Sequence, residues 1–355
     1  MSRIFYILLL TVPLFSSTLD GLIDYAMKHS TVVKQSQAEA ELSQAKHKES
    51  QSEQLGSIDL VANYTHYNLP RTLIPLTPAV MKDPVSASNV ATTKDLFGTG
   101  IFYSVPLFTG FAQTRQIEMD SMAIKLSQSK LSLTKEQLAY NVASLYLSIL
   151  ALQDMTNAQR KHVEALKKLK NIIGNEVKLG KKAQIDLLKA ENDLYGNISY
   201  LEVIKGNIAM TKASLASLIG MDHIGTIQPI TVSVKKSNYS IDRLMNETSS
   251  LDKVIIADLN LKKAGKGIEK SESSKLPQVS LDGYYGHNYG ENDPTNLHSG
   301  DFVNEENWQI GLNAKWTLYD FGKRDASIQK AKIRHWVLLQ NPISVQIFYH
   351  KLVVR

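Results

Sequence analysis

The sequence contains no cysteine among its 355 residues. Disulfides, thiol catalysis, thiolate zinc sites, iron–sulfur clusters and lipid attachment through an N-terminal cysteine are therefore excluded. After residue 20 the chain also lacks any run that approaches the ~20 uncharged apolar residues of a membrane-spanning helix. A role in a membrane would therefore need an architecture other than spanning helices.

Charge of one sign is not concentrated along the chain. Lysine and arginine number 40 against 34 aspartates and glutamates, and the basic residues are spread among the acidic ones. Nucleic acid is therefore not predicted as a partner. With 43% hydrophobic and 21% charged residues, the composition is that of a folded protein.

The N-terminus has the order of a secretory signal. Arg3 precedes an apolar run over 4–15, and small residues follow at 16–18. We therefore predict a signal peptide over 1–18 and export of the remaining chain. Because Leu14 and Phe15 crowd the expected cleavage site, an uncleaved anchor or a buried N-terminal helix is the alternative.

The following segments change from a helical period to an alternating one. Residues 19–56 are rich in Ala, Gln, Glu, Lys and Ser and predict one long polar helix. Residues 57–68 and 98–108 alternate in polarity, as strands with two different surroundings do. Residues 69–97 between them carry four prolines and predict an exposed loop.

A heptad pattern begins at about residue 112. Apolar residues recur at steps of four and three up to about residue 179, and after Gly180 a second helix carries Leu187, Leu194, Leu201, Ile208 and Leu215 at strict sevens. The two helices predict a long antiparallel coiled-coil hairpin. At about 1.5 Å per residue, the first helix would reach on the order of 100 Å, which suits a strut or a tube wall.

The same order of elements begins again near residue 241. A polar helix to Lys275 is followed by a strand over 276–289, a loop, and a strand over 308–319. Ile58, Leu60, Tyr64 and His66 fall opposite Val279, Leu281, Tyr285 and His287 at one constant offset. We therefore predict two structural repeats, over 19–240 and 241–333, the second of them incomplete.

The alternation assigns the strand residues to two faces. The apolar face has aromatic residues at both ends, which is the girdle pattern of a lipid-facing barrel strand. Four strands cannot close a barrel, so several copies of the chain must contribute to it. The residues predicted to face lipid are Ile101, Tyr103, Trp308, Ile310, Leu312 and Trp316.

Taken together, these features resemble the TolC-like outer-membrane efflux protein family. The resemblance rests on the repeated order of elements and on three segments, VPLFTGF at 105–111, LGKKAQIDLLKA at 179–190 and LASLIG at 215–220. It implies an α+β membrane protein, with a long helical coiled-coil hairpin and four β-strands contributed to an oligomeric transmembrane β-barrel. It also implies a homotrimer in the outer membrane of a Gram-negative bacterium, with a periplasmic helical domain that docks a periplasmic adaptor and an inner-membrane pump.

The C-terminal part departs from the family pattern. A family member should follow Arg324 with a second long hairpin, whereas this sequence ends at Arg355. From Arg334 it loses the heptad and carries Pro342. We therefore expect a C-terminally truncated member with an atypical tail over 334–355, of the kind that out-of-frame translation gives. A naturally short member is the alternative, and no gate residues are assigned.

The sequence assigns no catalysis, metal or cofactor. Asp320-Phe321-Gly322 matches the metal-binding tripeptide of protein kinases, but no glycine-rich loop or catalytic His-Arg-Asp motif accompanies it, so a strand exit is expected. His66 and His287 lack nearby carboxylate or histidine ligands at useful spacing. We therefore predict that the protein is not an enzyme.

The hairpin turn is the predicted docking site. In the family this turn meets the adaptor, and a small residue such as Gly180 lets another backbone approach closely. The predicted contact residues are Leu179, Gly180, Lys181, Lys182 and Asp186. For the lysines near the turn, a solvated helix face is the alternative.

The expected function is a passive exit duct for drugs or secreted substrates, as the outer-membrane channel of a tripartite efflux or type I secretion system. Two alternatives are a non-functional truncated fragment of such a channel and a periplasmic coiled-coil adaptor protein. An adaptor should show a lipoyl-like or small soluble β-barrel domain, whereas these strands have the alternation of lipid-facing ones.

Overall fold

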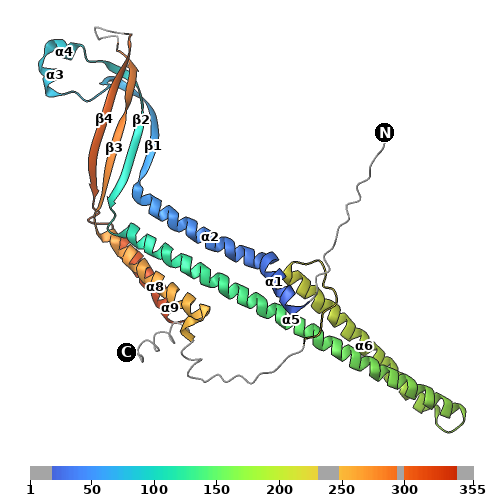
Figure 1. Ribbon diagram of the computed structural model, residues 1–355. Helices are drawn as coiled ribbons and strands as arrows, with labels where there is room; N and C mark the ends of the chain where they lie inside the picture. The colour runs from blue at the N-terminus through green and yellow to red at the C-terminus, as the bar shows by residue number, and fades with distance from the viewer. Residues whose placement is uncertain (1–17, 231–247, 294–299, 342–355) are drawn as a thin grey trace, which may run out of the picture. The chain divides into compact units, whose positions relative to one another are not determined.

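The computed structural model describes residues 18–230, 248–293 and 300–341. The chain divides into two compact units, one of residues 1–40 and 128–248 and the other of residues 41–127 and 249–355. Helices α2 and α5 each contribute to both (Figure 1). The predicted signal peptide lies, except for Thr18, outside the described residues.

The first unit is helical. It contains α1 (Leu19–His29), most of α5 (Ala112–Lys178) and α6 (Gln184–Ile219), which ends at Gly220 in a left-handed conformation. The Tyr146 hydroxyl donates a hydrogen bond to the Gln228 carbonyl at 2.6 Å, and burial raises the pKa of Tyr146. The buried core includes Leu22, Ala26, Leu138, Val142, Tyr146, Ile149, Leu215 and Ile219.

The predicted helix over 19–56 is interrupted at Ser30. The structure has α1, then α2 (Thr31–Ser52), and a 3-10 turn η1 (Glu53–Leu55). Ser30 leaves the helical conformation, with φ −58° and ψ 128°, and is itself buried. The prediction of one unbroken helix was wrong because no glycine or proline marks the break, whereas the separate α1 packs Leu22 and Ala26 into the core.

The second unit contains a four-stranded antiparallel sheet in the order β1-β2-β3-β4 (Figure 1). The strands are β1 (Ser57–Thr72), β2 (Thr92–Phe108), β3 (Gln278–Glu291) and β4 (Phe302–Lys315). The central pair, β2 and β3, joins residues that are far apart in the sequence. Ser104 and Asp282, for example, are paired although 178 positions separate them. Two local hairpins therefore meet through one long-range pairing.

Several strand bounds differ from the prediction. β1 continues to Thr72, β2 begins at Thr92 and β3 covers Gln278–Glu291. β4 begins at Phe302 and ends at Lys315, so the predicted strand over 308–319 was placed several residues too late. The extra residues lie at the loop ends of the strands, where the sequence loses its apolar alternation.

The loop between β1 and β2 is shorter than predicted and contains two helical turns. These are α3 (Pro78–Lys82) and α4 (Pro84–Ser88), each begun by a proline at a first-turn position. The Asp83 carboxylate accepts hydrogen bonds from the Val85 and Ser86 amides. The Ser86 hydroxyl, and then these amides, lower the pKa of Asp83.

Helices α8 (Asp252–Glu272) and α9 (Lys323–Leu339) pack against each other, and 3-10 turns η2 (Thr248–Ser250) and η3 (Ser273–Lys275) flank α8. The predicted atypical tail begins inside α9, which stays helical to Leu339, and the rest of the tail from residue 342 lies outside the described residues.

Within 18–230, 248–293 and 300–341, no helix is long and apolar enough to cross a membrane.

Two similar junctions lead from strand to helix. After β2, Gly110 and Phe111 have positive φ, and after β4, Phe321 and Gly322 do. The Thr109 hydroxyl accepts a hydrogen bond from the Gln113 amide, and the Asp320 carboxylate accepts one from the Arg324 amide. The Asp-Phe-Gly tripeptide is therefore a helix start. By conformation, Gly110 therefore corresponds to Phe321, and Phe111 to Gly322.

Candidate functional site

One face of the sheet is apolar across all four strands. The register aligns Leu60, Ile101, Tyr285 and Trp308 in one row, and Ile58, Tyr103, Gly283 and Ile310 in the next. A third row aligns Val105, Leu281 and Leu312. The structure thus brings Ile101, Tyr103, Trp308, Ile310 and Leu312 together on one face, as their alternation implied.

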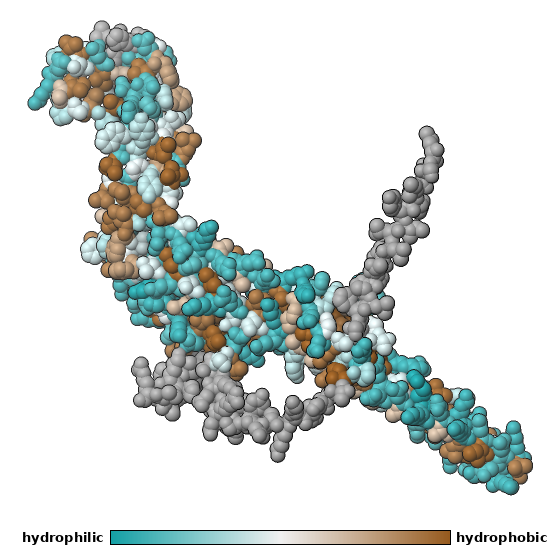
Figure 2. Space-filling view, in the orientation of Figure 1, coloured by the Kyte–Doolittle hydropathy of each residue, from teal (hydrophilic) through white to brown (hydrophobic). Residues whose placement is uncertain are grey.

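The apolar side chains of this face are highly exposed. Leu60 is 85% exposed, Ile310 69% and Leu312 70%. Figure 2 shows apolar residues gathered over the sheet, whereas the visible surfaces of the helices are mainly hydrophilic. A contiguous exposed apolar surface of this kind marks a surface that meets a membrane or a partner.

Trp316 is placed differently from the other five residues. It follows the last residue of β4, and its indole nitrogen donates a hydrogen bond to the Lys275 carbonyl at 3.1 Å. The ring is nonetheless exposed. An exposed indole with a satisfied N–H at the end of a strand is the arrangement expected of an interfacial tryptophan.

The opposite face of the sheet is polar. Its rows include Asn63, Gly98, Asn288 and Glu305, and Asp59, Phe102, Tyr284 and Gln309. The Ser104 hydroxyl donates a hydrogen bond across β2 and β3 to Asp282, at 2.7 Å. A Cβ at Gly100 would lie 2.7 Å from carbons of the Tyr284 ring, so glycine is needed there for the ring to lie against the strand. The two faces therefore suit two different surroundings.

The hairpin turn forms a second candidate site. Gly180 has φ +69°, its amide donates to the Val177 carbonyl, and the Lys181 amide donates to the Glu176 carbonyl at 2.8 Å. These are the two hydrogen bonds of a Schellman motif, which ends α5. Glu176 also pairs with the Lys182 ammonium at 3.0 Å. The turn is thus fixed by its own backbone and by one ion pair.

The predicted contact residues lie together at this turn. Leu179 is 70% exposed, and a Cβ at Gly180 would have no atom within 4 Å. Lys181 and Lys182 are exposed as well, whereas Asp186 is half-buried in the first turn of α6. The exposed apolar residues Ile185 and Leu188 extend the surface beyond the residues that the sequence pattern selected.

An ion-pair network that the sequence reasoning missed joins α5 to α8 below the sheet. Arg115 pairs with Glu118 at 2.9 Å and with Glu269 at 2.8 Å, and Lys266 pairs with each carboxylate at 3.1 Å. The hydrogen bond from Lys266, followed by that from Arg115, lowers the pKa of Glu118. Glu269 and Glu118 raise the pKa of Lys266. The signal that could have found it is the i,i+3 spacing of opposite charges on both helices.

Residues 22–221, more than half of the chain, match the family described as outer membrane efflux protein. The chain belongs to this family. Its channels are trimeric transport proteins without enzymatic activity, and they lie in the outer membrane of Gram-negative bacteria with a helical extension in the periplasm.

Among curated proteins, the chain is similar to the outer membrane protein TolC of Vibrio cholerae serotype O1. The two are 21% identical over 246 residues, which cover 68% of this chain and 55% of the relative. The chain thus spans little more than half the length of that relative.

Solved structures share the fold. The outer membrane protein VceC from Vibrio cholerae superimposes with a TM-score of 0.72 at 14% identity, over 93% of this chain and 76% of VceC. The CmeC outer membrane channel of Campylobacter jejuni gives a TM-score of 0.72 at 17% identity, over 93% of this chain and 68% of CmeC. These similarities confirm the predicted fold class, the TolC-like arrangement of long helices with four antiparallel strands.

Proposed function

We propose that this chain is the outer-membrane channel component of a tripartite efflux or type I secretion system. In this role it provides a passive exit duct for drugs or secreted substrates, and an inner-membrane pump supplies the energy. The observation that carries the proposal is the sheet, which has one apolar face, one polar face and two open edges.

The open edges support assembly of several copies. β1 and β4 each have one strand neighbour within the described part of the chain, so one edge of each has no strand partner there. Unpaired backbone N–H and C=O groups are too costly to leave in lipid, so spanning strands must close into a barrel. If β1 of each copy pairs with β4 of the next, three copies supply twelve strands, and the trimeric state of the family fits this closure.

The two faces support the assignment of lipid and lumen. With the apolar face outward, Ile101, Tyr103, Ile310 and Leu312 would face lipid, and the tryptophans at 308 and 316 would lie toward the two ends of the apolar stretch of β4. The polar face, with Asn63, Asp282 and Gln309, would then line the water-filled duct.

Membrane placement is tested by fractionation and cross-linking. The protein should be recovered with the outer membrane as a trimer, and cysteines introduced in pairs on β1 and β4 should form disulfides between copies. Because the chain has no native cysteine, every cross-link reports the introduced pair. Pairs on β2 and β3, which are interior strands, provide the control and should not link different copies. Recovery as a soluble periplasmic monomer would refute the proposal.

The exposed hairpin turn supports the proposed adaptor contact. It presents Leu179 and Gly180 between the ends of two helices, with Lys181 and Lys182 beside them. An exposed apolar side chain next to an unobstructed backbone suits docking against a helical partner tip.

Two substitutions at Gly180 separate docking from turn geometry. Gly180→Asn adds a side chain that tolerates the left-handed conformation, whereas Gly180→Val adds one that does not. If close backbone approach matters, both variants should lose cross-linking to the adaptor while the trimer persists. Normal cross-linking in Gly180→Asn would show that the turn only needs glycine for its own conformation.

A further inference from the structure

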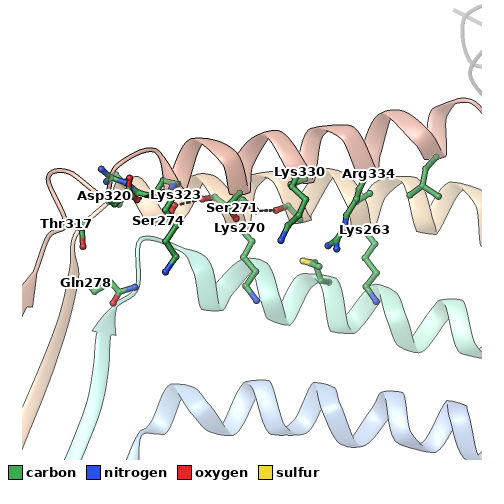
Figure 3. Close-up of a pocket in the computed structure, with 18 of the residues that line it drawn as sticks. Lys263, Lys270, Ser271, Ser274, Gln278, Thr317, Asp320, Lys323, Lys330 and Arg334 are labelled. Carbon is green, nitrogen blue, oxygen red and sulfur yellow. Dashed lines mark hydrogen bonds and ion pairs between the residues drawn. The ribbon is translucent and has the colours of Figure 1, made fainter.

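A groove with a volume of about 900 Å³ lies between α8 and α9, where these helices meet the sheet (Figure 3). Its walls come from the two helices, from the adjoining ends of β3 and β4, and from Met119 of α5. All of these residues belong to the second unit. The volume is that of a site for a drug-sized molecule rather than for a single ion.

The two helices build the groove with one shared pattern. α8 contributes Lys263, Gly267, Lys270 and Ser271, and the 3-10 turn η3 continues this side with Ser274; α9 contributes Lys323, Ser327, Lys330, Ala331 and Arg334. Both sets follow the spacing i, i+4, i+7, i+8 and i+11, which keeps them on one helix face. Small residues thus alternate with long cationic ones, and Figure 3 shows the lysines of α8 and α9 reaching into the space between the helices and α5.

The groove has a large excess of positive charge. Among its lining residues, six cations have no carboxylate partner within the described part of the chain: Lys263, Lys270, Lys315, Lys323, Lys330 and Arg334. The one lining carboxylate, Asp320, is paired with Arg324 at 3.0 Å. The Lys270 ammonium donates to the neutral Gln116 amide oxygen. Clustered like charges repel one another, so an anion that enters the groove relieves a cost that the free protein carries.

The groove adjoins the polar face of the sheet. Gln278 and Lys315 are paired in register and both line it, and they alternate with Val279 and Ala314 of the apolar face. Under the proposed orientation, a molecule in this groove would therefore be in contact with the duct and not with lipid.

The lining is also partly apolar. Met119, Leu276 and Leu338 contribute side chains between the cationic residues. A small inorganic anion would leave these groups uncovered, whereas an organic anion could place its apolar body against them and its charged groups against the lysines.

We propose that the groove binds an organic anion that carries more than one negative charge on an apolar body, and that this is a subsite for cargo at the junction of the sheet and the helices. The role in cargo transfer rests on the proposed function. Binding itself rests only on the groove.

Pyranine, a pyrene with three sulfonates, is a suitable probe, and its binding to the full chain in nonionic detergent is measured by fluorescence anisotropy. The test variant is Lys263→Glu with Lys330→Glu. The matched control is Lys253→Glu with Lys332→Glu, which makes the same charge change on the same two helices at exposed lysines outside the groove. The control ligand is 1-pyrenemethylamine, which has the same apolar pyrene body but a positive charge in place of the negative ones.

We expect saturable pyranine binding that weakens by about tenfold or more in the test variant, since two favourable charge contacts become repulsive, and by about twofold or less in the control. Pyrenemethylamine should not compete. Absence of saturable binding, or equal weakening in both variants, would overturn the proposal. Circular dichroism checks whether the test variant keeps its helices. If it does not, the neutral variant Lys263→Gln with Lys330→Gln replaces it, with glutamines at 253 and 332 as the control. The groove variant should again weaken binding more than its control, and equal weakening would overturn the proposal. Because binding is measured in detergent, it would persist if the chain proved not to be an outer-membrane trimer.

Discussion

In the helical unit, Val142, Ile149 and Leu215 are fully buried within the chain, whereas in the sheet Leu60, Ile310 and Leu312 are at least 69% exposed. The two regions have similar apolar side chains but different ways of removing them from water. The helical unit forms a core of its own, in which α1 packs against α6. The sheet has an apolar face that the described part of the chain leaves exposed, so under the proposed function we expect its stability to depend on lipid and on neighbouring copies.

The largest expected effect compares the same substitution in both regions. Ile149→Ala should reduce the free energy of unfolding by about 2–5 kcal/mol, because it removes a fully buried side chain and leaves a cavity. Ile310→Ala should reduce it by only about 1–2 kcal/mol, because detergent or lipid fills the space and only the transfer free energy is lost. Urea unfolding in detergent, followed by circular dichroism, measures both. Equal losses would mean that the face around Ile310 is packed like a core.

The next largest effect on stability is expected from a positive charge placed on one face or the other of β4. Leu312→Arg should cost about 2–4 kcal/mol of stability in bilayers, as a cation on the lipid face near the membrane centre does. Asn313→Arg puts the same side chain on the polar face and should cost much less. Folding into vesicles, compared for the two variants, provides the measurement. If Asn313→Arg were the more damaging change, the two faces would have to be exchanged.

The faces of the strands could be predicted from sequence, but their ends could not. Around Ile101 and Ile310, the alternation of apolar and polar residues is strong because the two sides of the sheet have different surroundings. In Thr92–Asp95 and Asn304–Asn307 the strands continue while polar residues occupy both faces. Under the proposed membrane placement, these residues would extend past the bilayer and have water on both sides, so alternation would no longer mark them.

The helix break and the charged sites show a second limit of prediction from the sequence. Ser30 interrupts the first helix because of how α1 packs, and no local residue pattern announces it. Gly180 was identified as the turn, but the Glu176–Lys182 pair depends on where α5 ends. The basic groove needs α8 and α9 side by side, although the seven-residue spacing of Lys263 and Lys270, and of Lys323 and Lys330, is visible in the sequence.

The smallest expected effect is the pH dependence of the Arg115–Glu118–Lys266–Glu269 network. Because the pKa of Glu118 is held below its ordinary value of 4.5, its contribution to stability is present above that value and is lost as pH falls through the lowered pKa. The raised pKa of Lys266 gives a contribution that is present below 10.5 and is lost as pH rises above it. The denaturation midpoint should therefore decline at both extremes, by a small amount because the pairs are partly exposed.

Glu118→Gln should flatten the acid decline of the urea midpoint. Glu41→Gln, at an exposed position on α2, is the control and should leave it unchanged. The same acid decline in wild type and in Glu118→Gln would show that the network does not contribute.

The most direct measurement of the difference between the two sheet faces uses single cysteines at adjacent positions of β4, Gln309→Cys and Ile310→Cys, in a chain that has no other thiol. Each variant is reconstituted into vesicles and treated with a small, charged, membrane-impermeant maleimide. If the polar face lines a water-filled duct and the apolar face meets lipid, the cysteine at 309 should react and the one at 310 should not until detergent is added. Equal reaction at both positions in intact vesicles, or reaction at 310 alone, would contradict the account.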